Sequence, residues 1–257
     1  MIELSIVDGV AEVVLNAPER LNALDPAALG ELLEAYIEAE RAGVRALVLR
    51  GEGRAFCAGR DIANVDPATD DVLAYLGDLV TPLLERMSRF PAPTFATAHG
   101  ACLGVGLGLL IATDVVYVAE SAKIGSPFAN LGATLDSGGH ALFLERLGAH
   151  KTLDLIYTGR LMSGSEAVAS GLFSQALPDD DVLDATRAAA RGAASGATAA
   201  FVESKRLIAA LRDERLGLWR SMDAENRAQA ALCATADYRE GFAAFREKRR
   251  PVFTGRG

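Results

Sequence analysis

Apolar and polar residues alternate at the beginning of the chain, which is the pattern of half-buried strands. The alternation covers residues 2–7 and 10–16, and Asp8-Gly9 between them favours the two-residue turn of a β-hairpin. Asp25-Pro26 can cap and begin a helix, and the apolar residues that follow recur at helical spacing. The compact apolar run from Val44 to Leu49 indicates a buried strand of a parallel sheet.

The middle of the chain continues this alternation of strands and helices. A helix is expected near residues 72–89 and strands at Thr94–Ala98 and Val115–Ala119, with a glycine-rich stretch between the two strands. Strands and helices that alternate through loops of ordinary length predict an α/β fold with a parallel sheet.

Beyond residue 137 the chain becomes rich in alanine and helical, with a short strand near Ser174–Leu177. Ser195-Gly196 interrupts two helical stretches, so we expect a core at residues 1–195 and a C-terminal helical region at residues 196–257. Amphipathic helices expected at 198–211 and 222–236 offer surfaces for packing against another subunit.

Composition argues against several classes of protein. The formal net charge is −8 without a compensating basic stripe, so nucleic-acid binding is not expected. No apolar run reaches the roughly 18 residues of a membrane span, and the first residues do not have the basic segment of a signal peptide. Three widely spaced cysteines without a CxxC pair indicate reduced thiols, and we expect a cytoplasmic protein.

Four segments in the chain resemble those of one known family. They are Pro18–Leu24, Gly53–Asp61, His99–Asp114 and Ser121–Gly139. On these segments the chain resembles the crotonase superfamily of enoyl-CoA hydratases and isomerases. The resemblance implies an α/β spiral of ββα units with a C-terminal helical trimerisation region. It also implies an acyl-CoA thioester as substrate, no separate cofactor, and a homotrimer or a dimer of trimers.

The resemblance further implies an oxyanion hole. In the family the thioester oxygen lies between two backbone N–H groups, which correspond here to those of Arg60 and Val105. Ala58, Gly59 and Gly104 are small enough to let the backbone approach the ligand. The helix that begins after the second turn adds positive potential at the developing oxyanion. Taken singly, each glycine loop also suits a tight turn packed against a helix.

The two glutamates that hold a water molecule in the family's hydratases are missing. An ungapped match places Gly108 and Phe128 at their positions. Hydration needs one group that takes a proton from water and another that delivers one. We therefore expect ordinary hydratase activity to be disabled.

Asp136 is the carboxylate that remains on the matching segment. Residues 121–139 and the chain ending resemble in particular the 1,2-epoxyphenylacetyl-CoA isomerase branch, in which an acidic residue stands at this position. One carboxylate can remove a proton, give an enolate and return the proton elsewhere, and an apolar neighbour such as Phe128 would raise its pKa. Two other interpretations stay open: a helix N-cap, and the nucleophile of a related dehalogenase branch.

Other polar residues are weaker candidates. His99 and His140 have no Ser or Cys partner at a recognisable spacing, and no His/Cys/Asp cluster has the spacing of a metal site. Glu145 is the second candidate for the base, although Glu145-Arg146 on an amphipathic helix is more typical of a solvated pair. Cys57 is expected to be a small buried residue.

The chain ending matches family residues that contact coenzyme A (CoA). Phe245 and Lys248 correspond to an aromatic ring and a lysine that reach the CoA of a neighbouring subunit. The alternative is a solvated basic helix end. Arg20 is a weaker candidate for a phosphate contact, and Asp61 belongs to the expected substrate-binding loop.

Together these features predict an acyl-CoA isomerase that moves a double bond or rearranges a ring epoxide through an enolate. The alternatives are hydration, another lyase, hydrolase or dehalogenase reaction of the family, and acyl-CoA binding without catalysis.

Overall fold

The computed structural model describes residues 1–63 and 65–255. Its first hairpin consists of β1 (Ile2–Val7) and β2 (Val10–Leu15), paired antiparallel so that Val7 lies opposite Val10. Asp8 and Gly9 have φ angles of 50° and 76°, the left-handed values that a tight hairpin turn requires. The hairpin predicted from the alternating pattern is confirmed.

Six strands form the main sheet, in the order β1-β2-β3-β4-β6-β9. After the hairpin, four strands join in parallel: β3 (Ala46–Gly51), β4 (Thr94–Ala98), β6 (Val115–Ala119) and β9 (Gln175–Leu177). Every residue of β4 is buried, because helices cover both faces of the sheet. This burial explains the continuous apolar runs in the sequence, and the predicted parallel α/β sheet is confirmed.

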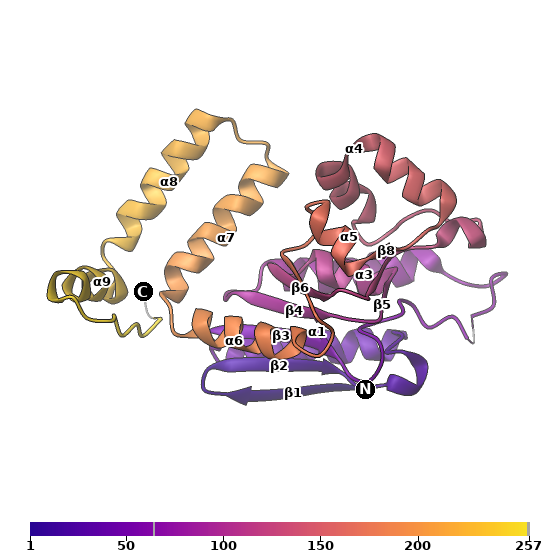
Figure 1. The fold of residues 1–257 in the computed structure, drawn as a ribbon, viewed down its shortest axis with the longest axis horizontal. Helices are drawn as coiled ribbons and strands as arrows, with labels where there is room; N and C mark the ends of the chain where they lie inside the picture. Colours follow the sequence, from indigo (N-terminus) through magenta and orange to yellow (C-terminus); the bar gives the residue numbers. More distant parts are fainter. Residues whose placement is uncertain (64, 256–257) are drawn as a thin grey trace.

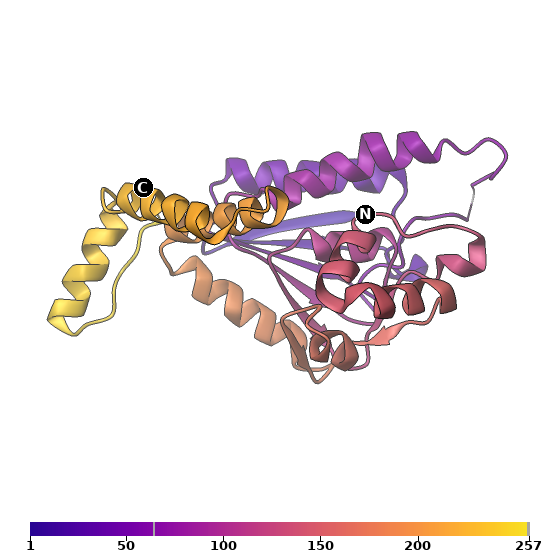
Figure 2. The ribbon, with the colours of Figure 1, turned by 90° about the horizontal axis from the view of Figure 1, so that it is seen from above.

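The two faces of the sheet are covered by different parts of the chain (Figures 1 and 2). One face carries α1 (Pro26–Arg41), the π-helical segment η2 (Ala74–Val80) and α2 (Thr81–Ser88), and the other carries α6 (Val182–Ala194). The Asp25 carboxylate accepts a hydrogen bond from the Ala28 N–H (2.8 Å) and caps α1. The helix start predicted from Asp25-Pro26 is therefore confirmed.

A second sheet contains strands that the sequence pattern did not predict. Its order is β5 (Ala101–Leu103), β7 (Lys123–Gly125) and β8 (Met162–Ser163), and α5 (Gly164–Ala169) follows. These strands have only two or three residues each, too few for an alternating pattern to be recognised.

Units of two strands and a helix recur along the chain. β4-β5 leads to α3 (Val105–Ile111), and β6-β7 leads to α4 (Gly139–Thr158). In both units the first strand enters the large sheet and the second strand enters the small one. This confirms the spiral of ββα units that the family resemblance implied.

The spiral places the loop after β3 beside β5. Cys57 and Cys102 form an isolated bridge, in which the Cys57 N–H donates to Ala101 O (2.9 Å) and the Leu103 N–H donates to Cys57 O (3.0 Å). The loop that contains residues 53–61 and the glycine turn before α3 are therefore neighbours, although they are far apart in the sequence.

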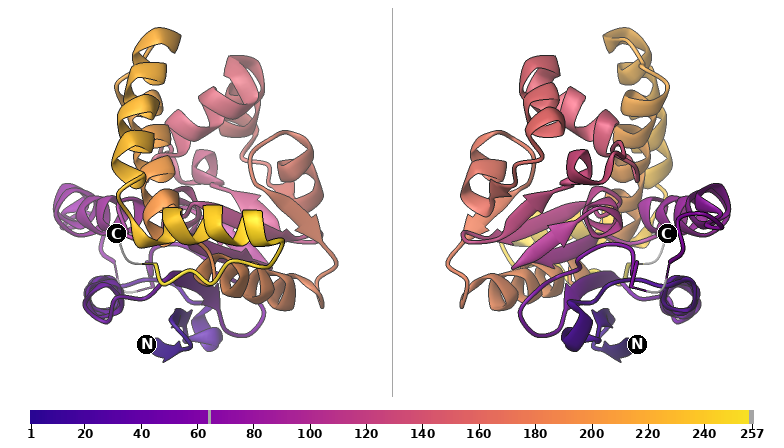
Figure 3. Two further views of the ribbon diagram at one scale, coloured as in Figure 1. Left: turned by 90° about the vertical axis from the view of Figure 1, so that its left-hand side faces the viewer. Right: turned by 90° about the vertical axis from the view of Figure 1, so that its right-hand side faces the viewer.

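Three helices form the end of the chain: α7 (Thr198–Asp213), α8 (Leu218–Leu232) and α9 (Ala236–Glu247). Figure 3 shows α7 and α8 rising away from the sheets, with α9 lying across their base. The helix expected at 222–236 ends earlier, because Thr235 accepts a hydrogen bond from the Tyr238 N–H (3.1 Å) and caps α9. The turn at 195–197 coincides with the predicted boundary, and the division into two domains stays a prediction. No helix within residues 1–63 and 65–255 is long and apolar enough to cross a membrane.

Candidate active site

Two glycine turns approach each other closely at the predicted site. Gly59 has a φ of 99°, and a Cβ atom placed on it would lie 2.8 Å from Leu103 O and 3.6 Å from the Val105 nitrogen. Gly104 has a φ of 53°, and a Cβ there would lie 3.1 Å from the Phe128 ring. Both positions favour glycine, because a side chain would be strained at these φ angles. At position 59 it would collide with Leu103 O, and at position 104 it would crowd the Phe128 ring. The structure brings these predicted site residues together.

The N–H groups of Arg60 and Val105 belong to this junction. Ala58 and Asp61 donate their N–H groups to carbonyls within residues 21–24 (2.9 and 3.0 Å). No hydrogen bond within the described part of the chain uses the Arg60 N–H. Val105 is the first residue of α3, where the N–H has no partner within the helix. Its branched side chain is buried in the core.

Asn22 anchors the first of these loops, and it was not among the predicted site residues. Its fully buried side chain donates to Ala55 O (2.8 Å) and Phe56 O (3.1 Å), and its amide oxygen accepts from the Ala17 N–H (2.8 Å). Buried polar groups must be paired in this way, so the loop is fixed by one amide. The available signal was a polar residue placed between apolar ones in the segment Pro18–Leu24.

Arg20 connects the same loop to the beginning of α1. Its guanidinium donates to the carboxylates of Asp25 and Asp61, both at 3.1 Å. The pair with Asp61 restrains the residue that follows Arg60. Arg20 is thus engaged by carboxylates of its own chain, and its contact with a phosphate stays a prediction.

The side chain of Arg60 is clamped beside the junction by two residues that the sequence pattern did not single out. Asp70 accepts two hydrogen bonds from the guanidinium (2.7 and 2.6 Å), and the Tyr75 ring centre lies 4.1 Å from its central carbon. The Tyr75 hydroxyl in turn donates to Leu24 O (3.0 Å). This clamp holds a positive charge in a fixed place.

Asp136 lies in the turn before α4, near that charge. Among the described residues, neither its buried Oδ1 atom nor the buried hydroxyl of Ser137 has a hydrogen-bond partner. Burial raises the pKa of Asp136. The Ser137 hydroxyl, which lies nearby but without hydrogen-bond geometry, and the Arg60 guanidinium both lower it. The N-cap interpretation of Asp136 is wrong, because the cap position is Gly138 (φ 85°) and no side chain caps α4.

The positions expected to carry glutamates in a hydratase offer no acid or base. Gly108 lies on α3 against Ser137, and Phe128 begins the short helix η3 (Phe128–Leu131), where its ring packs against Gly104. A water molecule would find no carboxylate at either position. That these two positions correspond to the glutamates of the hydratases stays a prediction.

The weaker candidates have structural contacts. His99 Nε2 lies 3.0 Å from a backbone carbonyl, and His140 Nε2 lies 3.3 Å from a threonine hydroxyl. Glu145 is exposed and pairs with Arg146 (3.2 Å), which confirms the predicted solvated pair. Cys57 is buried as predicted, and burial raises the pKa of its thiol to about 12. Within the described residues, no group of three or more His, Cys, Asp or Glu side chains is arranged to hold a metal ion.

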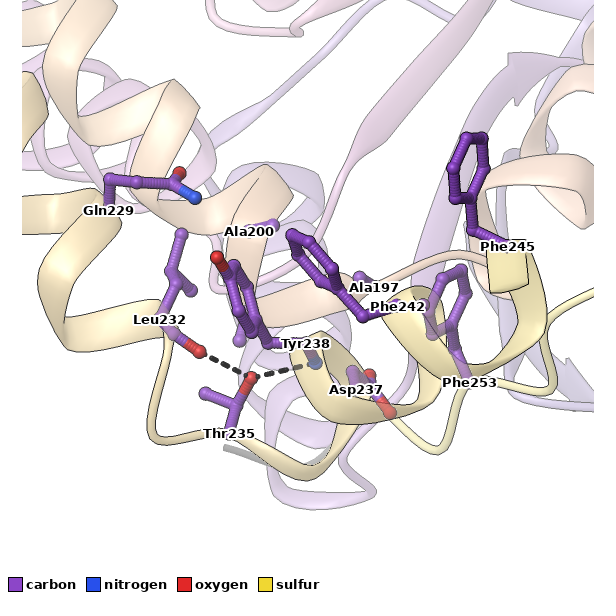
Figure 4. Close-up of a pocket in the computed structure, with 12 residues that line it drawn as sticks. Ala197, Ala200, Gln229, Leu232, Thr235, Asp237, Tyr238, Phe242, Phe245 and Phe253 are labelled. Atoms are coloured by element: carbon purple, nitrogen blue, oxygen red, sulfur yellow. Dashed lines mark hydrogen bonds between the residues drawn. The ribbon is translucent and has the colours of Figure 1, made fainter. Parts of the chain in front are cut away.

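An apolar pocket of about 400 Å³ lies among the C-terminal helices (Figure 4). Its aromatic lining comes from Tyr238, Phe242, Phe245 and Phe253. The Asp237 carboxylate at its edge is already used by the N–H groups of residues 254 and 255 (2.8 and 2.9 Å). We do not assign the active site here, because the pocket has no free acid or base.

The two predicted CoA contacts at the chain end lie far from Asp136 within one chain. Phe245 is 85% exposed, and Lys248 ends α9 with a φ of 55°. Figures 1 and 2 place α9 at one end of the molecule and α4 at the other. A role for Phe245 and Lys248 at the site of a neighbouring subunit stays a prediction.

Comparison with known proteins gives a consistent result. The model of the enoyl-CoA hydratase/isomerase family matches residues 5–256. A Rhodobacter capsulatus protein named "Probable enoyl-CoA hydratase" is 35% identical over 255 residues, which cover 99% of this chain and 98% of that protein. The 1,2-epoxyphenylacetyl-CoA isomerase of Escherichia coli is 33% identical over 253 residues, which cover 96% of each chain. The crystal structure of an enoyl-CoA hydratase from Bacillus anthracis superposes with a TM-score of 0.90 at 28% identity, covering 99% of each chain.

Proposed function

Because the chain belongs to the enoyl-CoA hydratase/isomerase family, we propose that it is an acyl-CoA isomerase that uses Asp136 to move a proton on an enolate. The enolate oxygen is held by the backbone N–H groups of Arg60 and Val105. Its substrate is a CoA thioester with a movable double bond or a ring epoxide.

The observation that carries this proposal is the buried, unpartnered Oδ1 atom of Asp136. A buried carboxylate oxygen without a hydrogen-bond partner costs folding free energy, so its retention favours a function. Its raised pKa also makes it a stronger base than an ordinary aspartate once it is ionised. It takes a proton from one carbon of the acyl group and returns the proton to another, so no water is consumed.

The proposed oxyanion hole is supported by the two glycine turns and the start of α3. The glycine turns at 59 and 104 let the two backbone segments approach each other closely, and the N-terminus of α3 adds a partial positive charge. One such N–H donor typically contributes roughly 3–4 kcal/mol to stabilising the transition state. Because the donors are backbone groups, a glycine is needed beside them but no particular side chain is needed on them.

Hydration is the competing function, because several relatives are named as enoyl-CoA hydratases. It would need a carboxylate pair around water, and Gly108 and Phe128 cannot provide one. The Escherichia coli relative is named as an isomerase of a ring epoxide, which supports including ring epoxides of arylacetyl-CoA among the substrates.

The proposal can be tested with a panel of CoA thioesters incubated in water enriched in ¹⁸O. The panel contains crotonyl-CoA, enoyl-CoA compounds with the double bond at different positions, and 1,2-epoxyphenylacetyl-CoA. We expect a rearranged product of unchanged mass and negligible conversion of crotonyl-CoA. Hydration of crotonyl-CoA with ¹⁸O uptake at a typical turnover, on the order of 10 s⁻¹, would contradict the proposal.

A further inference from the structure

The side of α3 that faces the Asp136 turn has room only for glycine. A Cβ atom placed on Gly108 would lie 2.5 Å from the Ser137 Cβ, 3.1 Å from Ser137 O and 3.3 Å from a methyl group of Leu84. Unbonded carbon atoms pack at roughly 3.5–4.0 Å. Even a single methyl group at position 108 would therefore have to displace Ser137.

Ser137 is held there by packing. Its φ is 51°, a left-handed value that is uncommon for a residue with a side chain, and the next residue, Gly138, has a φ of 85°. Its buried hydroxyl has no hydrogen-bond partner within the described residues. One backbone bond, from the Gly139 N–H to Asp136 O (2.9 Å), closes the turn. The contact with Gly108 thus determines how close the turn comes to α3.

We infer that Gly108 is a positioning residue, whose missing side chain provides the space that lets the Ser137 turn place Asp136 in the site. Asp136 is bonded directly to Ser137, so any shift of Ser137 moves the carboxylate. The inference rests on the proposed function as far as catalysis is concerned. In structural terms, a side chain at position 108 cannot coexist with Asp136 in its observed position.

Gly108 therefore does more than stand where the family's hydratases have a glutamate, because its lack of a side chain makes room for the turn that carries Asp136. Restoring a glutamate at position 108 would not add a second carboxylate beside Asp136. It would push away the turn that carries Asp136. A gain of hydratase function would therefore require a change in residues 136–138 as well.

The test compares Gly108→Ala, Ser137→Gly and the double variant. Alanine at 108 should displace Asp136 and lower kcat by about 100-fold, because small misplacements of catalytic groups are this costly, while KM changes little. Glycine at 137 removes the colliding Cβ and suits the left-handed φ. The double variant should therefore recover kcat to near the value of Ser137→Gly. Gly30→Ala is the matched control, because a Cβ at this exposed site on α1 meets nothing within 4 Å.

A second readout does not depend on turnover. In protein labelled with ¹³C-aspartate, the carboxyl resonance of Asp136, assigned as the signal lost in Asp136→Asn, reports its titration. The charged and titratable groups that act on it are Arg60 and Tyr75. We expect the raised pKa of Asp136 to move in Gly108→Ala, and in the double variant to match its value in Ser137→Gly, since both of these lack the Ser137 hydroxyl that lowers it.

An unchanged kcat and an unchanged Asp136 titration in Gly108→Ala would overturn the inference, as would a double variant no better than Gly108→Ala. If Gly108→Ala fails to fold, Ser137→Gly is compared with the double variant, and an altered Asp136 titration between those two contradicts the inference. Full turnover in Asp136→Asn would instead refute the proposed function and leave the titration test of the packing intact.

Discussion

The guanidinium of Arg60 lies 4.1 Å from the centre of the Tyr75 ring and is held there by two hydrogen bonds to Asp70. Arg60 therefore has two separate roles, one for its backbone and one for its side chain. The backbone N–H of Arg60 belongs to the proposed oxyanion hole, whereas its side chain sets a positive charge that lowers the pKa of Asp136.

Arg60→Met should therefore change the pH dependence while keeping the backbone N–H. Without the guanidinium, the ionised form of Asp136 loses a stabilising charge, so its pKa rises further. Since the base acts when ionised, the acidic limb of the profile of kcat/KM against pH should move to higher pH. Arg146→Met, at an exposed pair, is the control. An acidic limb that stays in place would show that the Arg60 charge does not act on the base.

Glu12 connects the main sheet to α6, and its replacement should cost stability in a pH-dependent way. It accepts hydrogen bonds from Arg187 (2.8 and 2.7 Å) and Arg50 (2.7 Å), which lower its pKa to about 2. Because folding lowers the pKa of Glu12, the ionised side chain stabilises the folded state at pH values above its ordinary pKa of 4.5. This stabilisation is lost as the pH falls through about 2.

Glu12→Gln should cost about 1–2 kcal/mol at pH 7, allowing for partial solvent screening. This lowers the melting temperature by about 2–8 °C for a chain of this size. The difference from the parent protein should shrink as the pH falls from 4.5 towards 2. Calorimetry at several pH values measures it, with Glu38→Gln on the exposed side of α1 as the control. If the two proteins differed in melting temperature by the same amount at all pH values, the lost stability would come from packing and not from the charge of Glu12.

The exposed aromatic surface at the chain end is expected to be covered by further copies of the chain. Trp219 is 77% and Phe245 is 85% exposed, and Phe245 also lines the apolar pocket of about 400 Å³. Large contiguous apolar surfaces usually mark an interface. Light scattering should give the mass of three or six chains of 27.0 kDa. A stable monomer at micromolar concentration would refute this prediction and remove the case for Phe245 and Lys248 acting across an interface.

The parts of the fold that the sequence revealed are those whose pattern is local and long. The strands Thr94–Ala98 and Val115–Ala119 were predicted with their observed bounds, because each is a short, mainly apolar run of the kind found in largely buried strands. The strands β5, β7 and β8 were missed, because they exist only through pairing with one another and have two or three residues each.

The candidate site likewise contains features that the sequence could reveal and features that it could not. The glycine turns at 59 and 104 could be predicted, because a left-handed backbone conformation favours glycine and is therefore visible in the sequence. Asn22 and the Arg60 clamp were missed, since their partners lie elsewhere in the chain. An aspartate before Ser-Gly-Gly suits both a cap and a base, and only the backbone angles showed that Gly138 occupies the cap position.

The central claim is that Asp136 is the base of an isomerase, and the structure makes Asp136→Asn a clean test of it. Since the side chain does not cap α4, replacing the carboxylate removes no helix cap. The raised pKa of Asp136 means that its ionisation disfavours folding as the pH rises through that pKa. Asparagine avoids this cost, so the variant should melt at the same temperature as the parent or higher at neutral pH.

The decisive measurement is the isomerase turnover of Asp136→Asn at neutral pH, with melting recorded on the same sample and a substrate identified from the thioester panel. Loss of an essential base lowers the rate by roughly 100- to 10,000-fold, and we predict a loss in this range with acyl-CoA binding and melting temperature retained. Turnover equal to that of the parent protein would contradict the claim and make Glu145 the next residue to test.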